Sequence, residues 1–354
     1  MQLLRTAPQF LLIAAALVAP QVARAATVTI PEGYMTFTIP AGSQTTPSVS
    51  TFSLPLSPRV PSNFVGQSIG AISSVGTNTI TNDSAGWTPG ALSTAATPYF
   101  IRITSGVATG RTFLISTSAS NPNTASTVTV DNQGTPLTGA NVGIVAGDRY
   151  ELFPAYTLSS LFGNSVLGGT SSSVADVVRL HNGSGWTEYY FNTSTNPGHW
   201  RVGSVPVSQD NVAIRPDSGI IFYRRGTSQI DLTLMGKVPS TDLQIVVNEV
   251  GATFVTGFPM DFTLDASDYK SMPTWVQNTG SVTDADKVTA YLSGSWKSFN
   301  YSQSAGQWRV STVPVNQGPL VTIPAGIPVI IESPSGATGL KIWKRTLPYS
   351  LSAN

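Results

Sequence analysis

Short runs of β-branched and aromatic residues recur along the chain, and clusters of Gly, Pro, Asn and Ser separate them. The clearest runs cover residues 27–30, 99–104, 112–116, 126–130, 220–223, 244–247 and 329–331. Runs of this length, bounded by turn residues, are typical of antiparallel strands rather than helices. The sequence therefore predicts an all-β protein, with a single helical turn within residues 156–162.

One stretch of the chain is repeated at an offset of about 110 residues. The matching segments are 175–178 with 285–288, 183–186 with 293–296, 198–202 with 306–310, and 205–207 with 313–315. Agreement in the same order at this many positions indicates duplication of one β-module. We expect tandem small β-sandwich or open-barrel modules, of which the last two are homologous repeats.

The first residues have the pattern of a secretory signal peptide. Arg5 supplies a positive start, residues 10–19 are apolar, and Ala23-Arg24-Ala25 is a small-x-small cleavage signal. The predicted domains are a cleaved signal peptide at 1–25, an N-terminal β module at 26–163, and repeat modules at 164–248 and 249–354. The expected location is the periplasm, the outer surface or the extracellular space.

Composition narrows the classes of partner. Only 10% of residues are charged, the formal net charge is +1, and there is no Cys. Nucleic-acid binding needs clustered Lys and Arg, which this chain lacks, so no nucleic-acid partner is expected. No later stretch reaches the length of a transmembrane helix. No phosphate-binding loop, dinucleotide motif or Cys/His array is present, so no cofactor and no metal is predicted. The oligomeric state stays open.

Four Trp residues, two in each repeat, are the candidate ligand-binding residues, together with an Arg that follows one Trp of each repeat. They are Trp186, Trp200, Trp296, Trp308, Arg201 and Arg309. Exposed Trp rings on a β-scaffold stack on sugars, and Arg supplies hydrogen bonds. The competing interpretation is that these Trp residues cap the core of each module, and it is the favoured one.

Other chemical signals are weak. Residues 66–70 satisfy the G-x-S-x-G pattern around Ser68, but no helix pattern follows, as a hydrolase nucleophile elbow requires. His181 and His199 have no His counterparts in the second repeat. Asp176 and Asp286 occupy the same place in both repeats, and this favours a structural cap at a turn over a pair of cation sites. No catalytic residue is predicted.

Several segments carry a resemblance to a known family: residues 105–110, 123–130, 146–152, 157–158 and 161–162, followed by the Gly-Trp-x-x-Tyr-Tyr and Gly-His-Trp-Arg segments. In these the chain resembles a family of uncharacterised secreted proteins found mainly in Verrucomicrobia. The resemblance implies export and a bacterial origin, and it carries over no activity, ligand or functional residue.

Three functions remain as expectations. The first is a non-enzymatic structural or adhesive protein of the bacterial cell surface or periplasm, with polysaccharide or other surface proteins as partners. The few charges and the repeated β-modules of this chain are suited to protein surfaces that pack against one another or against polysaccharide. The alternatives are a carbohydrate-binding protein that uses exposed Trp residues and, as a second alternative, an exported hydrolase.

Overall fold

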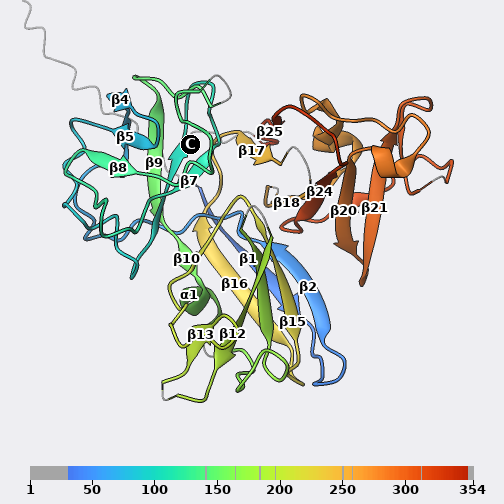
Figure 1. The fold of residues 1–354 in the computed structure, drawn as a ribbon, viewed down its shortest axis with the longest axis horizontal. Coiled ribbons are helices and arrows are strands. Elements are labelled where there is room, and N and C mark those ends of the chain that lie inside the picture. Colours follow the sequence, from blue (N-terminus) through green and yellow to red (C-terminus); the bar gives the residue numbers. More distant parts are fainter. Residues whose placement is uncertain are drawn as a thin grey trace, which may run out of the picture. The chain divides into compact units, whose positions relative to one another are not determined.

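The computed structural model describes residues 31–139, 142–163, 165–182, 185–195, 197–248, 251–256, 258–311 and 313–349. The predicted signal peptide and the predicted strand at 27–30 lie outside these residues. Within them, α1 (Leu158–Phe162) is the one α-helix, and the remaining regular structure is 25 strands and three short 3₁₀ turns (Figure 1). The all-β prediction is confirmed, and α1 falls inside the predicted helical turn. No helix among the described residues is long and apolar enough to cross a membrane.

Two sheets lie between residues 69 and 154 and share one hydrophobic cluster. The first has the order β3-β9-β6-β7 and the second β4-β5-β8. Their strands are β3 (Ile69–Ala71), β4 (Ser74–Val75), β5 (Thr79–Thr81), β6 (Tyr99–Ile103), β7 (Thr112–Leu114), β8 (Thr127–Thr129) and β9 (Arg149–Pro154). Ile101, Phe113 and Leu152 are fully buried in this cluster.

A second hydrophobic cluster lies under a five-stranded sheet with the order β13-β12-β11-β15-β2. A two-stranded ribbon, β1-β16, and a short pair, β10-β14, contribute to the same cluster. The strands are β1 (Glu32–Ile39), β2 (Ser48–Ser53), β10 (Tyr156–Thr157), β11 (Val177–His181), β12 (Trp186–Asn192), β13 (His199–Arg201), β14 (Ala213–Ile214), β15 (Gly219–Arg224) and β16 (Ile230–Lys237).

A third cluster lies under the five-stranded sheet β18-β24-β20-β21-β22, with the pairs β17-β25 and β19-β23. The strands are β17 (Leu243–Val247), β18 (Gly251–Val255), β19 (Phe262–Thr263), β20 (Lys287–Leu292), β21 (Ser295–Ser302), β22 (Gln307–Arg309), β23 (Thr322–Ile323), β24 (Val329–Ser333) and β25 (Lys341–Arg345). The 3₁₀ turns are Asp265–Ser267, Tyr269–Ser271 and Val282–Asp284.

The second and third groups of strands have the same pattern of pairing. Each pair among β1, β2 and β10–β16 has one counterpart among β17–β25: β1-β16 corresponds to β17-β25, β10-β14 to β19-β23, and the two five-stranded sheets to each other. The strands β3–β9 fall between β2 and β10, where the other group has only the short connection from β18 to β19.

Strand pairing crosses both of the predicted inner domain boundaries. β1 and β2, from the predicted N-terminal module, pair with β16 and β15 of the first repeat. β17, from the predicted first repeat, pairs with β25 of the second. Boundaries placed from sequence motifs do not take into account that strands far apart in the chain can pair with each other.

Residue patterns explain the local structure. β16 alternates strictly, so that Ile230, Leu232 and Leu234 are buried while the residues between them are exposed, as the pleat of a half-buried strand requires. α1 begins with a capping box, in which the Thr157 hydroxyl accepts the Ser160 N–H and the Ser160 hydroxyl accepts the Thr157 N–H.

Candidate functional site

Two of the four candidate Trp residues lie in the hydrophobic cores. Trp200 of β13 and Trp308 of β22 have no exposed surface. The Trp200 ring packs 5.5 Å from the ring of Phe162, and Trp308 packs 6.0 Å from Trp275, measured between centroids. For these two residues the structure agrees with the core interpretation, because a ring without exposed surface offers no platform to a ligand.

The other two Trp residues lie near the start of the longest strand of each five-stranded sheet and are partly exposed. Trp186 is 38% exposed and Trp296 is 40% exposed. Each ring meets the edge of its cross-strand partner: His181 lies 5.1 Å from Trp186, and Tyr291 lies 5.3 Å from Trp296. Burial lowers the pKa of His181 below its ordinary value, which favours the neutral imidazole beside the indole.

Arg201 and Arg309 are partly buried residues next to the core Trp residues. The Nε atom of each is buried without a hydrogen-bond partner among the described residues. The structure therefore does not gather the six candidate residues into one site, and of the six only Trp296 lines the groove described next.

A groove of about 820 Å³ runs along one edge of β21. β22 pairs with β21 only at Asn300–Ser302, so the preceding residues of β21 have a β-strand neighbour on one side alone, β20. The groove contacts the consecutive residues 296–300. Because alternate residues of a strand direct their N–H and C=O groups to opposite sides, part of this backbone faces the groove.

The opposite wall is the segment that follows β22. Its lining residues are Val310, Ser311, Gln317, Leu320, Val321, Thr322 and Pro324, and Val282, Lys287, Leu292 and Ser293 complete the groove. The lining thus combines a half-exposed indole with hydroxyl, amide and ammonium groups. The volume falls within the roughly 300–1,000 Å³ of small-molecule sites.

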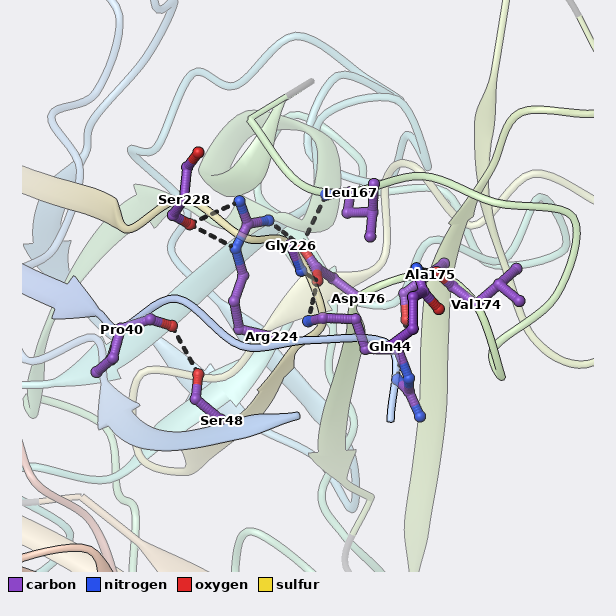
Figure 2. Close-up of polar contacts among 11 residues, drawn as sticks. Pro40, Gln44, Ser48, Leu167, Val174, Ala175, Asp176, Arg224, Gly226 and Ser228 are labelled. Carbon is purple, nitrogen blue, oxygen red and sulfur yellow. Dashed lines mark hydrogen bonds and ion pairs between the residues drawn. The ribbon is translucent and has the colours of Figure 1, made fainter. Parts of the chain in front are cut away.

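A buried carboxylate precedes β11 and is neutralised by an arginine (Figure 2). The side chain of Asp176 has no exposed surface and pairs with Arg224. One carboxylate oxygen also accepts the Leu167 N–H at 2.7 Å, and the other accepts the Arg225 N–H at 2.6 Å. This carboxylate therefore ties the segment before β11 to the end of β15.

A second buried carboxylate takes the same position before β20. Asp286 accepts the Val276 N–H at 2.6 Å, and the ammonium group of Lys341 lies 3.1 Å from its other oxygen. Lys341 also donates to the Ser333 hydroxyl at 3.0 Å, and both charged side chains are fully buried. Among the described residues no group of three or more possible ligands could hold a metal ion. Both carboxylates thus tie backbone segments together, although they bond to residues nine and ten positions away rather than capping their own turn.

The residues of the hydrolase alternative occupy separate elements. Ser68 is followed by β3, β4 and β5 rather than by a helix, so the context of a nucleophile elbow is absent from this part of the described chain. His199 Nδ1 lies 3.2 Å from a carboxylate oxygen of Asp210, whose other oxygen accepts the Trp200 N–H. Within the described residues no serine hydroxyl makes a hydrogen bond to the His199 ring.

In comparisons with known proteins, no family model, no curated protein and no solved structure matches the chain.

Proposed function

We propose that this chain is an exported, non-enzymatic protein of the bacterial cell surface that adheres to polysaccharide. Its binding site would be the groove along β21. The observation that carries the proposal is the presence of half-exposed Trp296 in a groove whose other lining residues include six with hydroxyl or amide side chains, beside seven apolar residues.

The groove suits a sugar polymer because it offers both kinds of contact that a sugar makes. An indole presents a flat apolar face to the C–H side of a sugar ring at low entropic cost, since only two side-chain torsions are fixed. The edge-on contact with Tyr291 restricts the ring further. Ser293, Ser298 and Gln317 supply donors and acceptors for the sugar hydroxyls.

The scaffold proposed for this site is a duplicated β-module. The repeated segments and the matching strand pairings both support duplication. In this proposal the first copy comprises β1, β2 and β10–β16, the second comprises β17–β25, and the strands β3–β9 form an insertion in the first copy. This division would replace the boundaries expected from the sequence.

The proposal predicts that Trp296→Ala weakens binding to polysaccharide several-fold while the protein stays folded. Removing one aromatic platform costs at least about 1 kcal/mol, or several-fold in affinity, by comparison with other aromatic contacts. The measurement is affinity electrophoresis of the full chain through gels that contain soluble polysaccharides, both neutral and acidic.

The matched control is Trp186→Ala, because Trp186 has nearly the same exposure and does not line this groove. The expected result is equal retardation of the unmodified protein and of the Trp186 variant, and clearly weaker retardation of the Trp296 variant. Retardation of all three proteins to the same extent, or of none by any polysaccharide, would contradict the proposal.

A further inference from the structure

We infer that the groove along β21 selects acidic saccharides, those that carry carboxylate or sulfate groups, over neutral ones. This inference rests on the proposed function, since it specifies which polysaccharide the same groove would hold. It depends on the charges that line the groove rather than on the presence of Trp296.

The charged side chains that line the groove are all of one sign. Lys287 and Lys297 are in the lining, and no Asp or Glu is. The chain as a whole has nearly equal numbers, with 19 basic and 18 acidic residues, so the positive sign of the groove comes from the positions of these two lysines. Neither lysine forms an ion pair with any described residue.

The two lysines reach the groove from neighbouring strands. Lys297 is exposed near the start of β21, where its ammonium group is free to meet a ligand. Lys287 begins β20, and its cross-strand partner is Asn300, which also lines the groove. Lys297 pairs with Ala290, three residues along β20 from Lys287, so the two cations lie about 10 Å apart along the strands and on opposite faces of the sheet. This spacing suits successive charges on a polymer better than a single small anion.

Two acidic residues lie near Lys287 without lining the groove, and Asp261 and Asp265 hydrogen-bond to Ala325 and Gly318 beside its opposite wall. Glu332 is the partner of Lys287 on β24, and its carboxylate accepts the Thr289 hydroxyl at 3.4 Å. Asp284 is exposed at the end of a 3₁₀ turn. Glu332 and Asp284 both reduce the positive potential at Lys287. Lys297 is therefore expected to contribute more than Lys287 to the selection of acidic saccharides.

The chemistry of the walls favours a saccharide over an extended peptide. A peptide that adds a strand to an open edge is recognised through pockets for its alternate side chains. Here the strand edge is accompanied by hydroxyls, two side-chain amides and a half-exposed indole, which match the hydroxyls and ring faces of a sugar, beside seven apolar residues.

The experiment compares polymers that differ only in charge. The full chain is titrated with polygalacturonate and with its methyl ester, and with dextran sulfate and dextran. The charged member of at least one pair is expected to bind about tenfold more tightly than the neutral member, and raising the salt concentration is expected to weaken that binding because screening acts on exposed charges. The two pairs separate carboxylate from sulfate as the recognised group.

Lys297→Gln is expected to reduce affinity for the charged polymer several-fold and to leave affinity for the neutral polymer unchanged. Lys287→Gln is expected to have the same effect, but smaller. The control is Lys344→Gln, which removes an exposed lysine of β25 outside the groove. If only the net charge of the protein mattered, Lys344→Gln would reduce affinity for the charged polymer as much as Lys297→Gln does.

The outcomes separate the inference from the proposed function. Equal binding of charged and neutral polymers, sensitive to Trp296→Ala, would overturn the selection of acidic saccharides and leave polysaccharide binding intact. Binding of no polysaccharide, or capture of a peptide in the groove, would overturn both. Charge-dependent binding that Lys344→Gln reduces as much as Lys297→Gln would also overturn the inference.

Discussion

At the scale of single residues, the two buried carboxylates show how one structural requirement is met by different side chains. The place that Arg224 takes at the end of β15 is taken by Ser333 at the end of β24. A serine carries no charge, and the cation for Asp286 comes instead from Lys341 on β25, which bonds to that same serine. In both cases a buried carboxylate keeps a cation and a backbone N–H, without which its burial would be strongly unfavourable.

Lys341→Met is expected to destabilise the protein by about 3–5 kcal/mol, because it leaves Asp286 buried without a cation. The double variant Lys341→Met/Asp286→Asn should recover a large part of that loss, since no net charge is then buried. Urea denaturation of the two variants and the parent measures both free energies of unfolding. A double variant no more stable than Lys341→Met would contradict this account of the pair.

At the scale of secondary-structure elements, α1 is a very short helix that depends on its first turn and on packing. Its buried residues are Leu158 and Phe162, and Phe162 contacts the rings of Trp200 and Phe222. A five-residue helix has little intrinsic stability, so the capping box at Thr157 and Ser160 contributes a large part of its local order.

Thr157→Ala is expected to lower the free energy of unfolding by about 1 kcal/mol, since the Ser160 N–H loses its acceptor. Thr157→Ser keeps the hydroxyl and should lose much less. Thermal melts of both variants followed by circular dichroism provide the measurement. Equal losses in the two variants would show that the methyl group, rather than the cap, carries the effect.

At the scale of the whole molecule, the buried residues form three main hydrophobic clusters rather than one. Trp200 belongs to the cluster under β11–β15, and Trp308 belongs to the cluster under β20–β24. Each of these two clusters has its own five-stranded sheet, so we expect each to unfold as a unit.

Trp200→Ala and Trp308→Ala are therefore expected to affect different unfolding transitions. Each variant should lose about 3–5 kcal/mol in its own cluster, as large core deletions do. Differential scanning calorimetry should show one transition lowered by the first variant and another lowered by the second. If both variants lower one and the same transition, the clusters unfold together and the expectation is wrong.

The sequence predicted the fold class and six of the strands, because alternation and turn residues act locally. Runs such as 99–104 and 329–331 became β6 and β24. It could not predict that β1 and β2 pair with β16 and β15, since these strands share no motif with β17 and β18. Pairing between distant strands depends on the whole fold rather than on neighbouring residues.

The candidate site was predicted only in part. Trp296 lines the groove, but Lys287, Lys297 and the open edge of β21 were missed, because an edge exists only once the partner strand is known to be short. A local signal for the buried Trp residues was present. In His199-Trp200-Arg201 and Gln307-Trp308-Arg309 a single apolar residue stands between two polar ones, and strand alternation then turns the Trp inward.

The different origins of the two cations also bear on how such a gene can change. Recombination that copies the coding region of β24 over that of β15 would install Ser at residue 224 without bringing the lysine of β25. The product would bury Asp176 without a cation, at a cost of several kcal/mol, and selection would remove it. Copying the coding region of β15 over that of β24 would replace Ser333 with Arg. Asp286 would then lie beside two cations, this Arg and Lys341. Under the proposed duplication, neither copy can replace the other at these strands without loss of stability, so the two copies are free to diverge and the groove along β21 need not have a counterpart in the first copy.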